Sequence, residues 1–437
     1  MAEPVPLERR ALLQSPDFRR LWAGDSAARL GYQIAQFALP LMAVTLLHVS
    51  ATKVGLVSAS QFVPVIALSL VAGSMVDRIS ARRLLVVCNL VRGAALGLLG
   101  LISALVGLSF WALLLVAVLV GSATVFYDVG YQSTVPRVLS VSELVSGNGL
   151  LQATNSVTQM AGPALAGFLV QAAGLPSAVG VTAGLFTAAV LSFWSFGSRE
   201  EAGERTARPK VSIRDGLRFT LKTRAVRDLC LQSGLYNLHE EAFLTAFMIY
   251  AVRTQHVSGG VVGVILGIGS IGALLGSLLA GRLSERLHAG MAVTTALLVA
   301  AASFLVGRLA AAVVLPLLAL TAAFVINGVA SAVYNVFAIS LRQAVPPAEY
   351  LGSVTASYRL VSFGTIPLGA LVGGVLVDWA GASRALLLIS ISMTVSCCML
   401  FTSPLRRIAS MAEAQQVFGT PEDAGDDSSA SSLAGRS

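Results

Sequence analysis

The charged residues of this chain are gathered into short clusters, and long apolar segments separate the clusters. Hydrophobic residues make up 55% of the chain and charged residues only 12%, whereas soluble domains contain about 25% charged residues. Many of the apolar segments approach or exceed the ~20 residues that an α-helix needs to cross a bilayer. This pattern predicts an all-α membrane protein, because helices satisfy their own backbone hydrogen bonds in lipid.

Twelve apolar segments are predicted to form transmembrane helices, joined by mostly short connections. Their expected bounds are 18–47, 53–76, 84–106, 109–135, 143–172, 177–198, 226–252, 259–281, 290–309, 312–341, 349–377 and 384–403. Short connections place consecutive helices antiparallel and side by side.

Basic residues dominate alternate connections and account for the net charge of +8. Arg9 and Arg10 precede the first segment, and Arg282 and Arg286 follow the eighth. The positive-inside rule places these connections and both termini in the cytoplasm, which suits a multi-pass protein of a bacterial inner membrane. A basic chain can also bind nucleic acid, but the alternation favours membrane topology, so no nucleic-acid partner is expected.

The predicted organisation has five parts. A cytoplasmic N-terminus (1–17) precedes a six-helix half (18–198). A central cytoplasmic loop (199–225) follows, and apolar and basic residues alternate over 211–224 in a pattern that suits either an amphipathic helix on the inner leaflet or a plain tether. A second six-helix half (226–403) precedes a cytoplasmic tail (404–437), which is expected to be disordered because it has few apolar residues.

The two halves repeat each other. Matching features recur about 204 to 211 residues apart: Asp17-Phe18 with Asp228-Leu229, Gly73 and Asp77 with Gly281 and Glu285, and Tyr127 with Tyr334. Such a repeat predicts two halves related by an axis along the membrane normal, with a binding site between them near mid-depth.

A short charged connection joins the second and third segments and contains Gly73, Asp77, Arg78, Arg82 and Arg83. The glycine lets a neighbouring helix approach closely, and the carboxylate lies at a helix end where an arginine can pair with it. This spacing resembles the G-x-x-x-D-R-x-x-x-R-R signature of the major facilitator superfamily.

That resemblance implies the major facilitator fold over nearly the whole chain. It also implies a conformational latch made of the hairpin residues, which Asp128 near the end of the fourth segment joins. The alternative is that the basic connection only sets topology.

The first segment opens with Phe18-Arg19-Arg20-Leu21-Trp22. This sequence motif resembles that of bacterial proton-coupled exporters of the enterobactin-exporter and macrolide-efflux type. In those exporters an acidic residue follows a glycine later in the helix; here Tyr32 follows Gly31, and Asp25 stands earlier.

The fifth segment contains Gly162, Pro163 and Gly167. This spacing resembles the antiporter motif of major facilitator exporters. Ordinary packing between small residues is the alternative explanation.

Placing an ionisable side chain inside the membrane costs free energy, so each such residue is expected to have a functional or structural role. Asp25 and Arg29 are four residues apart and can pair on one face of a helix. The functional reading is a carboxylate whose affinity for a proton changes as Arg29 engages and releases it. The alternative is a static ion pair that orients the helix.

Glu240 and Glu241 lie about twelve residues into the seventh segment, which places them near the membrane midplane at about 1.5 Å per residue. Two adjacent carboxylates in a low dielectric do not both ionise cheaply, so the pair is expected to hold a proton. Proton coupling, a site for a cationic substrate and simple hydrogen bonding between helices are the three readings.

Other polar side chains on helix faces are candidates for a substrate cavity. They are Arg29, Tyr32, Gln36, Arg92, Gln152, Asn155, Gln159, Tyr236, Asn237, Asn327, Asn335, Tyr358 and Arg359. The single cations Arg92 and Arg359 either bind an anionic group of the substrate or balance a buried carboxylate.

The prediction from sequence is a secondary active transporter rather than an enzyme. It exports a small amphipathic molecule (a drug, secondary metabolite or siderophore) by alternating access, using the proton gradient and no cofactor. No phosphate-binding loop or metal-ligand cluster is visible in the sequence. The expected partners are the substrate, protons and the bilayer, and the expected state is a monomer. The alternatives are proton-coupled uptake and a non-transporting membrane sensor or assembly partner.

Overall fold

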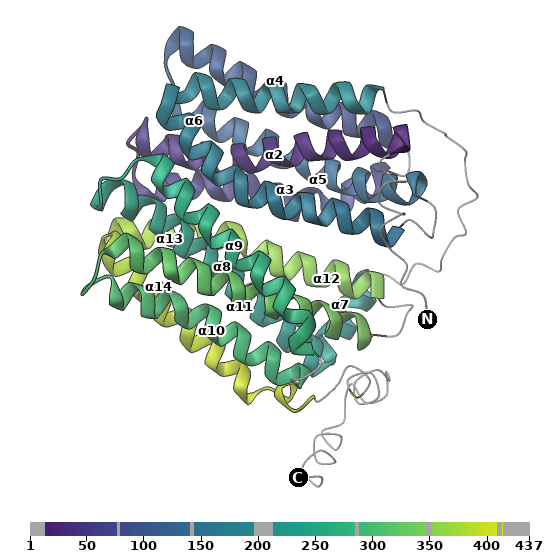
Figure 1. Cartoon of the computed structure of the whole chain (residues 1–437), viewed down its shortest axis with the longest axis vertical. Coiled ribbons are helices and arrows are strands. Elements are labelled where there is room, and N and C mark those ends of the chain that lie inside the picture. The colour runs from purple at the N-terminus through teal and green to yellow at the C-terminus, as the bar shows by residue number, and fades with distance from the viewer. Residues whose placement is uncertain are drawn as a thin grey trace. The chain divides into compact units, whose positions relative to one another are not determined.

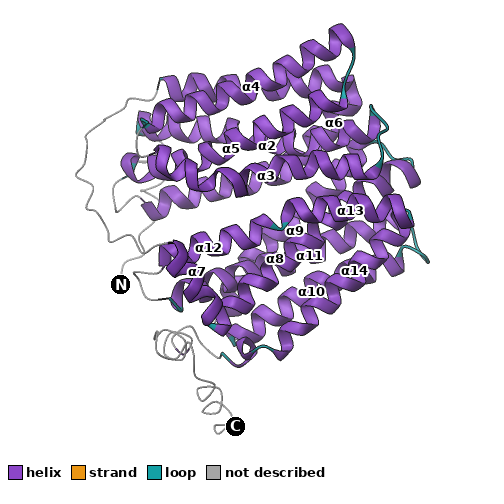
Figure 2. Cartoon of the chain, turned by 180° about the vertical axis from the view of Figure 1, so that it is seen from behind, coloured by secondary structure: helices purple, strands orange, loops and turns teal. Residues whose placement is uncertain are grey.

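The computed structural model describes residues 14–76, 79–139, 144–195, 213–284, 288–346, 351–408 and 413. Every regular element within these ranges is helical (Figure 1 and Figure 2). The α-helices are α2 (Pro16–Thr45), α3 (Ala51–Val76), α4 (Ala81–Val106), α5 (Phe110–Val138), α6 (Leu144–Trp194), α7 (Ile213–Lys222), α8 (Arg224–Ile249), α9 (Gly259–Ser284), α10 (Ala289–Ala310), α11 (Pro316–Ala344), α12 (Leu351–Gly364), α13 (Ile366–Ala380) and α14 (Ala382–Cys398). A π-helical turn (Tyr250–Thr254) extends α8, and two 3-10 turns (Met399–Thr402 and Pro404–Arg407) follow α14.

Nine helical segments in the described part of the chain are long and apolar enough to cross a membrane. The all-α, multi-span prediction is therefore confirmed, and the helix bounds are consistent with the twelve expected segments. Two of the long helices, α2 and α8, are less apolar than the others because they carry the charged residues discussed below.

Helix α6 contains most of two predicted segments, 143–172 and 177–198. Gly174 has φ +64°, a left-handed conformation that glycine adopts without steric cost. Four contacts with α2 give the direction of each arm: Trp22 with Thr154 and Gln33 with Gly162 for the first arm, and Gly24 with Phe193 and Gly31 with Phe186 for the second. The two arms therefore run antiparallel, and the chain reverses near Gly174.

The predicted eleventh segment is divided into α12 and α13 at Thr365. Pro367 lies in the first turn of α13. Its missing N–H and fixed φ favour the start of a helix over its interior.

The contacts divide the chain into two compact units. Unit 1 comprises Met1–Ala202 and Met248–Gly267, and unit 2 comprises Gly203–Phe247 and Ile268–Ser437. In unit 1, α6 packs against α2 and α4, while α5 packs against α3 and α4. In unit 2, α10 packs against α11 and α14, and the amphipathic α7 packs against α12. The first nine residues of α9 therefore belong to unit 1 and the remainder to unit 2.

The helix starts follow the predicted repeat. Helices α2, α3 and α4 each begin 208 residues before α8, α9 and α10, respectively, and α6 begins 207 residues before α12. Equivalent positions in the two units can therefore be identified by adding about 208 to a residue number.

Candidate functional site

An ion pair lies inside unit 1. Nε of Arg29 donates to one carboxylate oxygen of Asp25 at 2.8 Å, and the hydroxyl of Tyr127 donates to the other at 2.9 Å. The Asp25 side chain is completely buried, whereas that of Arg29 is 26% exposed. Hydrogen bonds to both of its oxygens satisfy the buried carboxyl group.

The guanidinium of Arg29 connects three helices. It pairs with Asp25 on its own helix, and Nη1 donates to Oδ1 of Asn155 on α6 at 3.3 Å. It also lies over the ring of Tyr131 on α5, 5.1 Å from the ring centroid. Movement of Arg29 would therefore break contacts to α2, α5 and α6 together.

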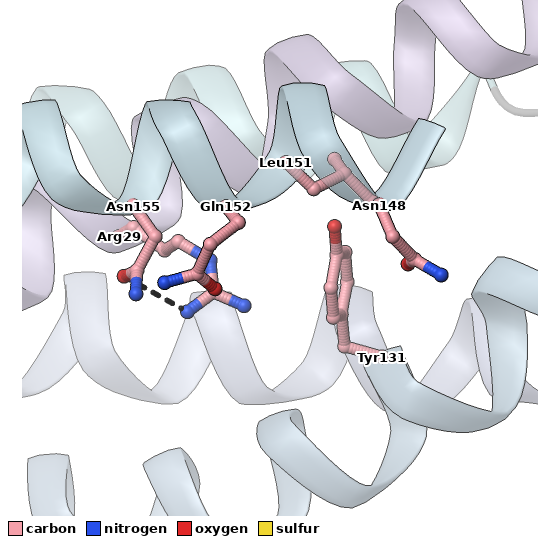
Figure 3. A pocket seen from close by; sticks show the side chains of 6 residues that line it. All are labelled: Arg29, Tyr131, Asn148, Leu151, Gln152 and Asn155. Atoms are coloured by element: carbon pink, nitrogen blue, oxygen red, sulfur yellow. Dashed lines mark hydrogen bonds between the residues drawn. The ribbon is translucent and has the colours of Figure 1, made fainter. Parts of the chain in front are cut away.

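Arg29 also borders a cavity of about 300 Å³ in unit 1 (Figure 3). The lining consists of Arg29, Tyr131, Asn148, Leu151, Gln152 and Asn155. Figure 3 shows α6 carrying the amide side chains, with Arg29 and Tyr131 approaching from other helices. The cavity offers one guanidinium, several amides and a phenol, which together suit a polar or amphipathic occupant.

The sequence analysis identified three of these six lining residues: Arg29, Gln152 and Asn155. It missed Asn148, Leu151 and Tyr131. One helix face at i, i+4, i+7 spacing contains Asn148, Gln152 and Asn155. Because the sequence analysis had identified Gln152 and Asn155 on this face, it could also have identified Asn148. Among the other candidates near this part of unit 1, Tyr32 and Gln36 are half-buried and Gln159 is exposed, and none of them lines this cavity.

Arg92 is buried away from the cavity, with an exposed fraction of 1%. Its Nη1 donates to Oδ1 of Asn89 at 3.4 Å. Its guanidinium lies 4.5 Å from the ring centroid of Tyr127, 5.5 Å from that of Phe186 and 5.9 Å from that of Tyr32. Within the described residues, Nε and Nη2 of Arg92 have no hydrogen-bond partner.

In unit 2, Glu240 and Glu241 are half-buried on α8. Asn327 is buried, and its amide donates to the hydroxyl of Tyr236 at 2.6 Å and to the carbonyl of Ala300 at 3.1 Å. These bonds join α8, α10 and α11 around the carboxylate-bearing helix.

Asn237 on α8 bonds across to α12. Its amide donates to the carbonyl of Ser362 at 2.8 Å and to the hydroxyl of the same residue at 2.9 Å. His239 bonds the carbonyl of Leu235 at 2.7 Å and the hydroxyl of Ser392 at 2.9 Å. Side chains on several faces of α8 therefore hold neighbouring helices.

Tyr358 begins a chain of hydroxyl groups in unit 2. It donates to Ser233 at 2.6 Å, and Ser233 in turn is hydrogen-bonded to Tyr334. The guanidinium of Arg342 lies 3.5 Å from the ring centroid of Tyr358. Two other cavity candidates, Asn335 and Arg359, are exposed, and Arg359 lies 5.9 Å from the ring centroid of Phe363.

Comparison with known proteins gives the family. A sequence model of the Major Facilitator Superfamily matches residues 21–364 and 229–418. The chain belongs to the major facilitator superfamily. It is a multi-pass membrane transporter, and members of this family are not enzymes.

Two curated relatives of this transporter are multidrug efflux pumps named Tap. The Mycolicibacterium fortuitum protein is 25% identical over 361 residues, covering 79% of this chain and 85% of the relative. The Mycobacterium tuberculosis protein is 28% identical over 360 residues, covering 78% and 83%. An inward-facing, occupied structure of a bacterial homologue of the human lysosomal transporter Spinster has a TM-score of 0.72 at 14% identity, covering 90% of this chain and 98% of that one. This last likeness concerns the fold alone.

The hairpin signature of the transporter is only partly within the described residues. Asp77 and Arg78 lie outside them, and Gly73 lies in the last turns of α3. Arg82 donates to the main-chain carbonyl of Trp194 near the end of α6, and Arg83 is exposed. The pairing of the hairpin residues therefore stays a prediction.

Asp128, which the family resemblance adds to the latch, is half-buried on α5 next to Tyr127. Its charge acts electrostatically on Arg92. A role in the latch stays a prediction as well.

The antiporter-like segment of this transporter lies where helices touch backbone to backbone. A Cβ atom at Gly162 would lie 2.4 Å from the Cβ of Gln33 on α2. One at Gly167 would lie 2.2 Å from the carbonyl oxygen of Gly259, and one at Gly263 would lie 2.2 Å from that of Pro163. The segment thus lets α2 and the first part of α9 approach α6 within unit 1.

Proposed function

We propose that this transporter exports a small amphipathic molecule from a bacterial cell in exchange for protons. The observation that carries the proposal is the double role of Arg29, which borders the cavity and holds the buried carboxylate of Asp25. The names of the Tap relatives, which are multidrug efflux pumps, support the export direction. A drug, a secondary metabolite or a siderophore is the proposed class of cargo.

The coupling follows from the charge balance of the pair. While Asp25 is ionised, its charge balances that of Arg29 and fixes the guanidinium against the cavity. A proton on Asp25 removes that partner, so Arg29 is free to move and the cavity loses its present lining. Cargo and proton therefore disfavour each other, and by linkage the effect is mutual. Such competition is what exchange requires.

Glu240 and Glu241 in unit 2 form the second candidate for the proton site, because adjacent carboxylates readily share a proton. Rearrangement of the latch residues Asp77, Arg83 and Asp128 would accompany the return to the inward-facing state. We also propose an inner-membrane monomer with both termini in the cytoplasm, consistent with the distribution of arginine residues.

The test measures accumulation of a panel of fluorescent amphipathic compounds in an efflux-deficient bacterial host. Wild type is compared at equal expression with Asp25→Asn and with Glu240→Gln/Glu241→Gln, each with and without a protonophore. Asp17→Asn is the matched control. Asp17 lies on the same helix and also forms an ion pair with an arginine, Arg20, at 3.7 Å, but its side chain is 44% exposed.

Lowered accumulation that disappears with the protonophore and in Asp25→Asn, but persists in Asp17→Asn, supports proton-coupled export through unit 1. Loss only in the double glutamate variant moves the proton site to unit 2. Inward accumulation driven by the proton gradient contradicts the export direction, and unchanged accumulation of the whole panel contradicts amphipathic cargo of this kind.

A further inference from the structure

Arg92 is buried at a cost that its hydrogen bonds do not offset, although the charge of Asp128 acts on it. Its exposed fraction is 1%, and in the described part of the chain two of its three guanidinium nitrogen atoms have no hydrogen-bond partner. A buried guanidinium with unused donors loses free energy of hydration without full compensation. A methionine or leucine would fill this place in a helix bundle more cheaply, so the charge itself requires a reason.

The side chain of Tyr127 connects the guanidinium of Arg92 to the carboxylate of Asp25. Its guanidinium is 4.5 Å from the ring centroid of Tyr127, and the hydroxyl of Tyr127 donates to Asp25 at 2.9 Å. A cation over an aromatic face withdraws electron density from the ring. The phenol then becomes a stronger hydrogen-bond donor, which favours the ionised form of the carboxylate that accepts from it.

The repeat within the chain supplies an internal comparison. Ser233 follows Asp25 by 208 residues, and Tyr334 follows Tyr127 by 207. The hydroxyl of Tyr334 is bonded to Ser233 just as that of Tyr127 is bonded to Asp25. The tyrosine and its bond are therefore present in both units, while the carboxylate is present only in unit 1.

The cation is absent from unit 2 together with the carboxylate. The positions 208 residues after Arg92 and Asn89 are Ala300 and Leu297, and α4 and α10 begin with the same offset. In unit 2 the tyrosine is hydrogen-bonded to a neutral serine. There, apolar residues replace both the arginine and the asparagine that accepts its hydrogen bond. The position 207 residues after Asp128 is the neutral Asn335. The buried cation thus accompanies the carboxylates of unit 1, Asp25 and Asp128, rather than the tyrosine.

We propose that Arg92 is a positioning residue that sets the proton affinity of Asp25 through Tyr127. The inference rests on the proposed function, in which Asp25 carries a proton. Titratable or charged groups on several helices act on either Asp25 or Arg92. Arg29 on α2 and Tyr127 and Tyr131 on α5 interact with Asp25. Tyr32 on α2, Cys88 on α4, and Tyr127 and Asp128 on α5 interact with Arg92. Helix α6 contributes the neutral Asn155, and Asp77 and Arg78, which follow α3, lie outside the described residues.

The test is an infrared titration of the full-length transporter in liposomes, which needs no cargo. The carboxyl C=O band that is lost in Asp25→Asn is assigned to Asp25, and its midpoint pH is measured. Loss of a nearby positive charge disfavours the carboxylate, so Arg92→Met is expected to move the midpoint to higher pH by about one unit or more. Arg92→Lys, which keeps the charge, should restore most of the wild-type midpoint.

Two further variants separate this role from a structural one. Lys53→Met removes another cation that lies over an aromatic ring in unit 1, 5.3 Å from the centroid of Phe110, and should leave the midpoint unchanged. Tyr127→Phe should itself raise the midpoint. Adding Arg92→Met to Tyr127→Phe should then produce a clearly smaller shift than it does in the wild type.

An unchanged midpoint in Arg92→Met overturns this inference and leaves the proton role of Asp25 intact. An equal shift in the presence and absence of the Tyr127 hydroxyl overturns the route through Tyr127. If no band depends on Asp25 at any pH, both the inference and the proton role of Asp25 fail.

Discussion

Asp25 and Arg29 combine a fully buried carboxylate with a guanidinium that still reaches a cavity. Removing one member of a buried pair is more damaging than removing both, because the remaining charge is left without compensation. We therefore expect Arg29→Met to lower the stability of the detergent-solubilised protein by about 3 kcal/mol. The double variant Asp25→Asn/Arg29→Met should recover much of that loss. Equal melting temperatures for the single and double variants, measured by thermal unfolding, would contradict this.

Gln152 and Asn327 were both assigned to a substrate cavity from sequence, but their surroundings differ. Gln152 is exposed and lines the cavity, whereas Asn327 is buried and donates to Tyr236 and Ala300. Gln152→Ala should weaken cargo binding with little change in melting temperature. Asn327→Ala should instead destabilise the protein by about 1–3 kcal/mol, because it leaves buried acceptors unpaired. Parallel transport and unfolding measurements on both variants distinguish the two roles.

The pairing of Asp25 with Arg29 could be predicted because both lie on one helix at a known spacing. The contacts of Asp25 with Tyr127, and of Tyr127 with Arg92, could not, since they join α2, α5 and α4 and depend on how three helices pack. Helix spacing says which residues share a face but not which face of another helix meets it. The sequence nevertheless carried one usable signal, the recurrence of Tyr127 as Tyr334.

At the scale of the helices, apolar length was sufficient to predict nearly all the helical segments. The reversal inside α6 coincides with Gly174 and with Pro176 two residues later, and the break before α13 with Pro367. Such residues mark a change of backbone conformation but do not fix its geometry. The close approach of α6 and α9 was also beyond prediction, because glycine spacing alone does not identify the partner helix.

Gly263 tests the contact between α6 and α9. A Cβ atom there would lie 2.2 Å from the carbonyl oxygen of Pro163, so the helices must separate. We expect Gly263→Ala to destabilise the protein by about 1–3 kcal/mol. Gly184→Ala on α6 is the matched control, since no atom lies within 4 Å of its added Cβ. It should be neutral or slightly stabilising, and similar melting temperatures for the two variants would show that the contact is not tight.

At the scale of the whole molecule, α9 contributes its first nine residues to unit 1 and the others to unit 2. The two halves of the sequence are therefore not independent units of folding. If the chain is divided within 199–212 and both fragments are expressed together, they should co-purify, and residues 1–202 expressed alone should be unstable. Gly263→Leu should weaken the co-purification. Stable, monodisperse expression of the first fragment alone would contradict this expectation.

The two units also differ in charge at equivalent positions. Unit 1 has Asp25 and Arg29 where unit 2 has Ser233 and Asn237. Asn237 bonds Ser362 while Arg29 bonds Asn155, 207 residues earlier, so the frame of hydrogen bonds is kept when the charges are absent. In unit 2 this frame of hydrogen bonds is thus formed without the two ions, so the Asp25–Arg29 pair of unit 1 is the natural place to look for chemistry.

The burial of Arg92 also bears on how the protein is made. An arginine at the centre of a helix costs about 2.5–3.5 kcal/mol when the translocon releases that helix into lipid. Helix α4 leaves the ribosome before α5 and α6, so Tyr127 and Phe186 do not yet exist when Arg92 reaches the membrane. Contact with α2, whose Tyr32 has already been synthesised, would therefore stabilise the new α4 until α5 and α6 are inserted. The early steps of biogenesis would then be assembly of a helix group rather than insertion of one helix at a time.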